Sequence, residues 1–190
     1  MDVLKLMKQR STTRHYTNKP ISQTALKKIL EAGIWGPALH HFQPWKFVII
    51  KNVALIKKIN RMVEKKLEDI NTPTFLLYPT IKTMANSKLL ICVYNTKDFT
   101  GIIERFNKEY FKKAELAEIS AIAAAIQNML LEAENLGIGT CWLDMPLFCR
   151  EEINKLLKIK DEMVAVLTLG YPLSKGKRSP RKKNTVVTIS

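Results

Sequence analysis

A short segment near the start of the chain combines cationic and hydroxyl side chains. Arg10 and Arg14 flank Ser11, Thr12 and Thr13, so two guanidinium groups and three hydroxyl groups fall within five residues. A guanidinium group is a planar fork of donors that matches phosphate oxygens, and hydroxyls add neutral donors. The spacing favours a binding site for a small anion. The alternative is a helix end, where cations face the helix dipole and the hydroxyls belong to a turn.

Three further segments have the glycines and prolines of rigid loops. Residues 36–45 read G-P-A-L-H-H-F-Q-P-W, and such a loop can present backbone donors and acceptors to a planar ligand. Residues 137–144 read G-I-G-T-C-W-L-D, and residues 170–172 read G-Y-P ahead of Arg178 and Arg181. Each of these segments is a weak signal when taken alone.

The positive charge of the chain is concentrated at its two ends. The net charge is +14, yet residues 31–162 are almost balanced. Residues 1–30 carry seven lysines and arginines against one acid, and residues 163–190 carry six and no acid. This distribution fits a nucleic-acid surface or two chain ends that converge on one small anion. A solvated, solubilising surface is the plain alternative.

Several kinds of site lack the residues that they need. The three cysteines, Cys92, Cys141 and Cys149, form no C-x-x-C pair, and the three histidines do not have metal-ligand spacing. We therefore expect buried or free thiols in a reducing cytoplasm, no metal site and no Cys–His nucleophile. The sequence also contains no phosphate-binding P-loop, no G-x-G-x-x-G, no G-x-S-x-G and no H-E-x-x-H.

Length and hydropathy favour one globular domain over residues 1–190. About 46% of the residues are apolar and 25% are charged, which is typical of globular chains. The segment Ile119–Leu131 is an uncharged run of 13 residues, shorter than a spanning helix of ~20 residues. The first residues contain no apolar signal core, so we expect a cytoplasmic protein without a membrane partner.

Hydrophobic periodicity predicts an α+β fold with a central, mostly antiparallel sheet flanked by helices. Helices are expected at 3–10, 22–33, 55–70, 101–112, 115–136 and 153–157, and strands at 45–50, 89–94, 138–144, 163–171 and 186–189. Residues 71–81 contain two prolines and no charge, and we interpret them as an apolar loop or a broken helix. The helix at 115–136 is apolar on almost every side, which indicates burial and possible sharing with a partner subunit.

Together and in this order, the four segments resemble the FMN-dependent nitroreductase family. Its R-x-[ST]-x-R-x-[FY] motif is matched by residues 10–16, and its A-P-S-x-x-N-x-Q-P-W motif by residues 36–45. A phrase like A-x-x-L-G-I-G-T-C-W is matched by residues 133–142, and G-Y-P with a basic segment by residues 170–172 and 181–182. The resemblance covers about residues 4–188 and implies a homodimer with one FMN at each end of the subunit interface.

The resemblance also implies a set of cofactor-binding residues. Arg10, Ser11, Thr12, Arg14 and Arg181 match positions that hold the phosphate and the polar edge of the flavin. Pro37, Ala38, Leu39 and His41 match positions that touch the isoalloxazine from the partner subunit. Leu143, Asp144 and Met145 match a backbone stretch that faces the ring near its N5 atom.

Two positions depart from the family pattern. The serine after the proline is Ala38, which lacks a hydroxyl, and the asparagine is His41, which can still donate or accept one hydrogen bond. Residues 71–112 match no motif well. Their aromatic residues either line a substrate pocket or belong to the ordinary core or a lid; they are Phe75, Tyr78, Phe106, Tyr110 and Phe111.

The activity that the resemblance implies is ping-pong hydride transfer from NADH or NADPH through the flavin N5 to a nitroaromatic, quinone or enone. In this chemistry the cofactor reacts and the protein binds and orients it, so no side-chain nucleophile is required. A related activity on the same fold, flavin destruction or reductive dehalogenation, is one alternative. A non-catalytic FMN-binding protein and a basic nucleic-acid-binding protein are the others.

Overall fold

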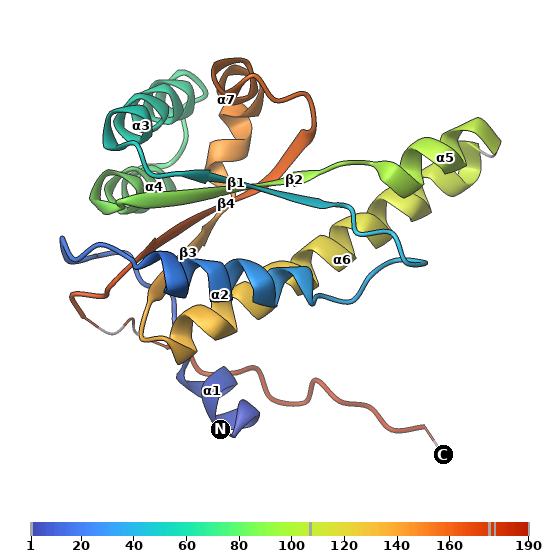
Figure 1. Ribbon diagram of the computed structural model, residues 1–190, viewed down its shortest axis with the longest axis horizontal. Coiled ribbons are helices and arrows are strands. Elements are labelled where there is room, and N and C mark those ends of the chain that lie inside the picture. The colour runs from blue at the N-terminus through green and yellow to red at the C-terminus, as the bar shows by residue number, and fades with distance from the viewer. Residues whose placement is uncertain (1, 107, 175, 177, 190) are drawn as a thin grey trace.

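Four strands form one antiparallel sheet in the order β1-β2-β4-β3 (Figure 1). The computed structural model describes residues 2–106, 108–174, 176 and 178–189. The strands are β1 Trp45–Ile50, β2 Leu89–Asn95, β3 Gly139–Leu143 and β4 Glu162–Gly170. Each lies within one residue of its predicted bounds, and the expected antiparallel sheet is confirmed. The strands β1 and β3 are the two edges of this sheet.

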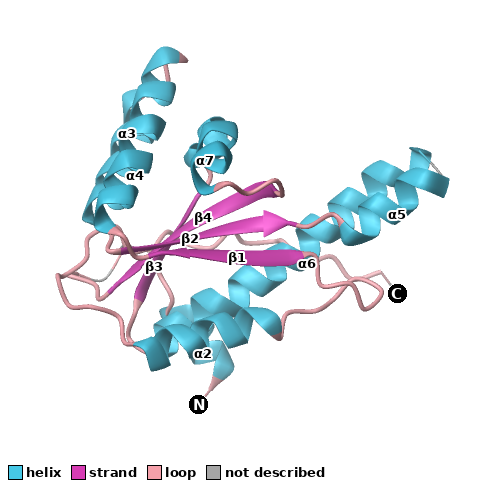
Figure 2. Cartoon of the chain, turned by 45° about the horizontal axis from the view of Figure 1, so that its top comes forward, coloured by secondary structure: helices cyan, strands magenta, loops and turns pink. Residues whose placement is uncertain are grey.

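Helices cover both faces of the sheet (Figure 2). The helices are α1 Val3–Gln9, α2 Gln23–Ile34, α3 Val53–Asp69, α4 Thr74–Asn86, α5 Asp98–Phe106, α6 Lys108–Asn135, the 3-10 helix η1 Met145–Cys149 and α7 Arg150–Leu157. The helices α2 and α6 lie on one face, and α3, α4 and α7 lie on the other. Ser22 caps α2 by accepting a hydrogen bond from the amide of Ala25 at 3.1 Å, as its type and position predict.

The central strand β2 is buried at every position and separates two hydrophobic clusters. Ile91 and Val93 belong to the cluster under α2 and α6, whereas Leu90 and Cys92 belong to the cluster under α3 and α4. This alternation follows from the twofold side-chain period of a strand. It explains why the segment reads as a continuous apolar run, with no polar face.

The helix α6 is buried along one face in this chain. Ala125, Met129 and Ala133 are buried in the cluster with α2, but Leu116 on the other side is 68% exposed. By length and hydropathy Glu109–Asn135 is also apolar enough to cross a membrane, but its packing against α2 and the sheet is that of a core helix. The expectation of burial on every side is therefore wrong for a single chain.

The loop or broken helix expected at residues 71–81 is wrong, because α4 continues through Pro79. An interior proline costs about 3 kcal/mol of helix stability. The burial of Leu77, Ile81 and Met84 against the α3 side of the core offsets that cost. Tertiary packing therefore decides the local structure here.

Two other predicted elements differ from the structure. The helix expected at 101–112 is divided, because α5 ends at Phe106 and residues 108–112 belong to α6. The strand expected at 186–189 is absent, and that segment is an extended, exposed tail. Its β-branched residues favour a strand, but no described strand of the same chain pairs with it, and a strand without a neighbour has no ladder.

Candidate flavin site

The cationic N-terminal segment is fixed along the β3 edge of the sheet. The amide of Thr13 donates to the carbonyl of Thr140 at 2.8 Å, and the amide of Thr17 donates to the carbonyl of Tyr171 at 2.8 Å. The helix α1 ends just before Arg10, so the segment is a helix end, as the alternative interpretation expects. The anion-binding interpretation stays a prediction.

Two glycines explain why the separate sequence segments meet here. A Cβ atom on Gly139 would lie 2.6 Å from the Cβ of Thr13, and one on Gly170 would lie 2.8 Å from the ring of Tyr16. Only glycine allows these close approaches. The buried Tyr16 hydroxyl then donates to the carbonyl of Thr13 at 2.7 Å. The segment is thus held by steric fit and by hydrogen bonds.

Arg14 borders a cavity of about 200 Å³ at the end of β3. Three of the predicted ring-facing residues, Leu143, Asp144 and Met145, line the same cavity. Its opposite wall is α4, which contributes Phe75, Leu76, Pro79 and Thr80. The structure therefore brings Arg14, but not Arg10, Ser11 or Thr12, into one cavity with the three predicted ring-facing residues, and it adds a wall from α4.

A second cavity of about 310 Å³ lies on the other side of Arg14. It is lined by Arg14, His15, Tyr78, Pro79, Lys82 and Thr83. Lys82 is the residue that sequence reasoning missed, and its ammonium lies 5.8 Å from the centroid of the Tyr78 ring. The signal was the helical spacing of Tyr78 and Lys82, which places both on one face of a helix. The two prolines of this segment favour a loop or a broken helix, so the sequence did not predict a continuous helix here.

The charges at this end of β3 act on the buried thiol of Cys141. Burial raises the pKa of this thiol, the positive charge of Arg14 opposes that shift, and the negative charge of Asp144 adds to it. Asp144 also accepts a hydrogen bond from the amide of Met145 at 2.9 Å, which begins η1. The thiol is therefore protonated at neutral pH. All three cysteines are free and buried, as expected.

The basic C-terminal segment returns to the N-terminal segment in part. A guanidinium nitrogen of Arg178 donates to the carbonyl of Gln9 at 2.6 Å, and a Cβ on Gly176 would collide with the carbonyl oxygen of Thr12. Within the described part of the chain, Arg181 is exposed and makes no hydrogen bond or ion pair. The two basic ends therefore meet at residues 9–12. The predicted phosphate contact of Arg181 stays a prediction.

The loop of residues 36–44 lies at the opposite edge of the sheet. It leads into β1, whereas the N-terminal segment lies along β3. Within this loop Pro37, Ala38 and His41 are exposed and Leu39 is half-buried. A single chain does not bring these four residues to Arg14. If these four residues contact the same ligand as Arg14, they must do so from a partner subunit.

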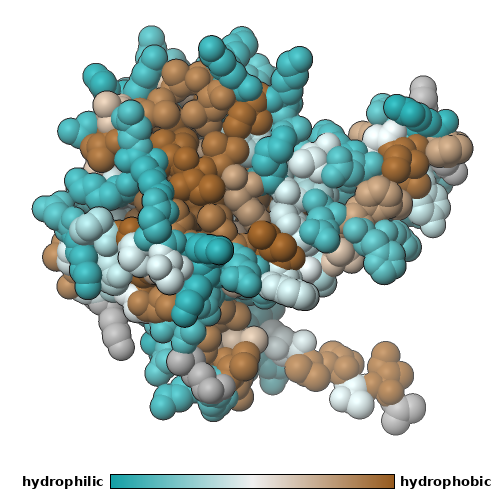
Figure 3. Space-filling view, viewed as in Figure 1, coloured by the Kyte–Doolittle hydropathy of each residue, from teal (hydrophilic) through white to brown (hydrophobic). Residues whose placement is uncertain are grey.

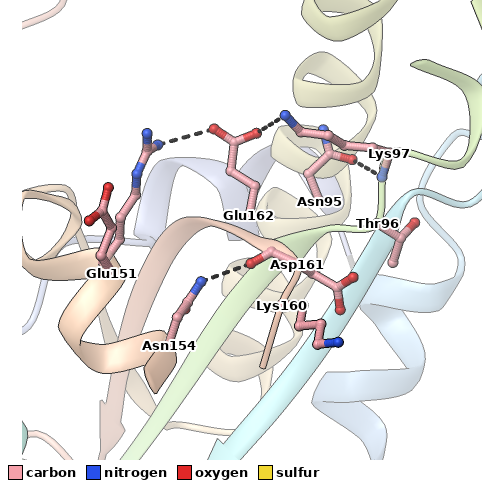
Figure 4. Close-up of a pocket in the computed structure, with 9 residues that line it drawn as sticks. Asn95, Thr96, Lys97, Glu151, Asn154, Lys160, Asp161 and Glu162 are labelled. Carbon is pink, nitrogen blue, oxygen red and sulfur yellow. Dashed lines mark hydrogen bonds and ion pairs between the residues drawn. The ribbon is translucent and has the colours of Figure 1, made fainter. Parts of the chain in front are cut away.

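A polar pocket of about 390 Å³ occupies a different part of the molecule (Figure 4). Its charged residues pair with one another: Glu162 lies 2.8 Å from the ammonium of Lys97 and 3.1 Å from the guanidinium of Arg150. No group of three or more metal-ligating side chains lies together among the residues that the structure describes. We therefore place the candidate site at β3 and α4.

Comparisons with known proteins agree with this fold. A model of the nitroreductase family matches residues 7–171. A Methanothermobacter thermautotrophicus protein, provisionally named NADH dehydrogenase/NAD(P)H nitroreductase, is 27% identical over 176 residues, covering 90% of this chain and 78% of that protein. An iodotyrosine deiodinase of Daphnia pulex is 23% identical over 175 residues, covering 87% of this chain and 57% of that protein.

A solved structure is also similar to this chain. The crystal structure of a Desulfovibrio desulfuricans protein, provisionally named a nitroreductase and solved with FMN, matches with a TM-score of 0.73 and 25% identity, covering all of this chain and 97% of that chain. The sheet, the long helix and the segment on the β3 edge thus define an oxidoreductase of the nitroreductase fold. Because the family match spans most of its length, the chain belongs to the nitroreductase family.

Proposed function

We propose that the protein is an FMN-dependent oxidoreductase that takes electrons from NADH or NADPH and passes them to a nitroaromatic, quinone or enone. The observation that carries this proposal is the position of Arg14. It belongs to the cationic segment on the β3 edge, and it also borders the cavity lined by Leu143, Asp144 and Met145. One arginine thus connects a phosphate-type donor set to a cavity suited to a flat ring.

The donor chemistry of this site fits FMN. Arg10 and Arg14 offer charge-assisted donors, and the partly buried Ser11 and Thr12 add hydroxyl donors in the same segment. The apolar wall of the cavity includes Phe75, whose ring is largely exposed and available to pack against a planar ligand. Both parts of an amphiphilic cofactor therefore find matching residues.

The protein residues would bind, orient and tune the cofactor. Bound FMN would supply the electron-transfer chemistry, and no side-chain nucleophile is needed. Arg14 would place a positive charge at the polar edge of the ring, where it favours the negative charge of the reduced state. The backbone of residues 143–145 would hold the ring at the end of β3, and α4 would shield it from water.

We further propose that the active form is a homodimer in which the loop of one chain completes the site of the other. Apolar side chains that a monomer leaves exposed support this proposal. They lie on α1, at the end of α2, on α6 and on the tail, and include Val3, Leu4, Trp35, Leu116, Val186 and Val187. Figure 3 shows the apolar side chains of the tail standing away from the body. We treat residues 1–190 as one domain within that dimer.

The colour and the flavin content of the purified protein test this function. We expect a yellow protein with about one FMN per subunit, as one site per chain of a symmetric dimer requires. Flavin released by denaturation is identified by chromatography, and oxidation of NADH and NADPH is followed with a nitroaromatic and a quinone. Release of FAD, or failure to bind added FMN, would contradict the proposal.

Reductive dehalogenation is a second candidate activity. The observation that favours it is the 23% identity to the iodotyrosine deiodinase, which covers most of this chain. The same reduced protein can be offered iodotyrosine in place of the nitroaromatic. Iodide release at a rate comparable with nitro reduction would favour this activity, whereas nitro or quinone reduction alone would favour the first.

A further inference from the structure

The junction between β2 and α5, residues 95–100, contains a concentration of polar contacts outside the cavities around Arg14. At its centre lies the carboxylate of Glu118, a residue of α6 that is 0% exposed. This carboxylate accepts hydrogen bonds from the amides of Phe99 at 2.9 Å and Thr100 at 3.0 Å. It also accepts from the side-chain amide of Asn95 at 3.0 Å and from the Thr100 hydroxyl. A buried charge with four donors is fully satisfied.

The same junction holds the loop of residues 36–44. The amide of Thr96 donates to the carbonyl of Pro44 at 2.9 Å. The ring of Phe99 contacts the rings of His40 at 5.4 Å and Phe42 at 5.5 Å between centroids. Of the three residues that donate to Glu118, namely Asn95, Phe99 and Thr100, Phe99 also contacts the loop directly.

The backbone of the loop needs such support. His40 and His41 both adopt positive φ angles, 44° and 67°, which are uncommon for residues other than glycine, although histidine is among the types that adopt them more often. The start of the loop is fixed separately, because Gly36 packs against the backbone of Ala125 in α6. The unfavourable turn at residues 40–41 is thus held from its far side by Phe99 and Thr96. Residues in such conformations persist when their surroundings determine them.

We propose that Glu118 is a positioning residue for the flavin site: by fixing residues 95–100 to α6, it sets the conformation of the loop that carries Pro37–His41. The proposal rests on the proposed function, in which that loop contacts the flavin ring. Glu118 itself lies behind the loop and acts through Phe99. Its negative charge suits this role, because a carboxylate accepts all four hydrogen bonds without offering a donor of its own.

The outer side of the junction carries charged residues, and one of them, Glu115, provides a control for a substitution of Glu118. Lys97 pairs with Glu162 at 2.8 Å, as Figure 4 shows, and with Glu115 at 3.7 Å. These ion pairs raise the pKa of Lys97, chiefly through its hydrogen bond with Glu162. Glu115 lies one helical turn before Glu118 and belongs to the same helix, but it is partly exposed and forms no recorded contact with Phe99 or Thr100. Glu115→Gln therefore removes a charge near the junction without removing its anchor.

The experiment compares FMN and riboflavin binding to the protein of residues 1–190, because riboflavin has the ring and lacks the phosphate. Glu118→Gln keeps the size of the side chain but introduces an NH₂ group among donors. We expect it to weaken both ligands by the same factor, about tenfold. We expect the visible absorption band of FMN to shift at saturating ligand, because the ring environment changes. Glu115→Gln should leave both affinities and the band unchanged.

Each outcome separates this inference from the proposed function. A wild-type protein that binds neither ligand overturns the proposed function, and with it the basis of the inference. A wild-type protein that binds FMN, with Glu118→Gln showing unchanged affinities and an unchanged band, overturns the positioning role alone. A lowered melting temperature with unchanged ligand affinities also overturns it, because the residue would then be only structural.

A second variant keeps the test decisive if Glu118→Gln does not fold. Phe99→Leu removes the ring that contacts His40 and Phe42 and leaves every hydrogen bond of Glu118 in place. We expect an equal loss of affinity for FMN and riboflavin and the same direction of band shift. Unchanged binding by a folded Phe99→Leu protein would overturn the proposed route from Glu118 to the loop.

Discussion

The two groups of candidate flavin-binding residues lie at opposite edges of one sheet and are held by different means. The phosphate half, residues 10–16 beside β3, is fixed by close steric fit over Gly139 and Gly170. The ring half, the loop of residues 36–44, is exposed and is supported by the junction that Glu118 anchors. In the proposed function, one half would hold the charged end of the cofactor and the separately supported loop would contact its flat end.

The comparison also bears on the proposed dimer. Strand order places β3 and β1 at the two outer edges, so no rearrangement within the sheet brings the halves together. A symmetric dimer presents the same patch twice and can set the β1-side loop of one chain against the β3-side cavity of the other. The two halves then form two equivalent sites.

The largest effect is expected from a variant that disturbs the close packing of Thr13 on Gly139. Gly139→Val would place a Cβ 2.5 Å from the hydroxyl oxygen of Thr13 and force the N-terminal segment away from β3. Overpacking of this kind costs about 1–3 kcal/mol of unfolding free energy. Because the phosphate half moves as well, we expect FMN affinity to fall by more than about a hundredfold. Calorimetry measures both quantities.

Gly101→Ala is the matched control for that variant. A Cβ at Gly101 meets no atom within 4 Å, and alanine is the better helix former in α5. It should leave FMN affinity unchanged and raise the melting temperature slightly. Equal behaviour of the two variants would mean that the close approach of Thr13 is not required.

A smaller and more selective effect is expected from Arg10→Ala and Arg14→Ala. Each removes a charge-assisted donor worth about 1.5–3 kcal/mol, so FMN should bind about 10- to 100-fold more weakly. Arg10→Ala should leave riboflavin binding and the melting temperature unchanged, because the residue supports a phosphate and little core. Arg14→Ala should also slow reduction by NADH or NADPH at saturating FMN.

An arginine on the far face, exposed like Arg14, controls for net charge. Arg61 lies on α3 and donates to the carbonyl of Lys57 within its own helix. Arg61→Ala should not change FMN affinity. If Arg10→Ala and Arg14→Ala also leave FMN affinity unchanged while they lower the melting temperature, the phosphate half is assigned to the wrong residues.

Removal of the tail tests the dimer rather than the cofactor. Truncation after Asn184 deletes Val186, Val187 and Ile189, each more than 80% exposed in the single chain. Burial of such a side chain contributes about 1.5–3 kcal/mol, and chain ordering offsets most of it, so we expect about tenfold weaker dimerisation. Sedimentation across a concentration series measures the change. An unaltered dissociation constant would show that the tail lies outside the interface.

The smallest effect is expected for nucleic acid. If the cationic segment holds a phosphate of the cofactor, only surplus charge remains, and binding to duplex DNA should be weak and lost at moderate salt. Filter binding with and without saturating FMN measures this. A salt-resistant, sequence-selective complex that FMN does not displace would favour the nucleic-acid alternative.

The sequence predicted the sheet well because its strands are apolar runs between turn residues. It also predicted the motifs that meet at β3, but not the reason, since the fit of Thr13 on Gly139 is visible only in three dimensions. It failed at Pro79, where packing overrides a helix breaker, and at residues 186–189, where strand-forming residues have no strand of their own chain beside them.

The surroundings of Glu118 likewise could not be predicted from the sequence. In the sequence it is one glutamate in an alanine-rich helix that also carries Glu115. Its role becomes visible only when the fold brings Asn95, Phe99 and Thr100 around its carboxylate. Periodicity identifies a helix face, but it does not identify which charge on that helix is buried among donors.

The most direct test of two halves from two chains is a mixed dimer. One chain carries Arg10→Ala with Arg14→Ala, and the other carries Ala38→Trp, which fills the exposed loop surface. Each homodimer should retain no flavin through purification. The doubly tagged mixed dimer should retain about one FMN per dimer, because one of its two equivalent sites is assembled from two unaltered halves. A mixed dimer without FMN would contradict the account, since each chain would then supply its whole site alone.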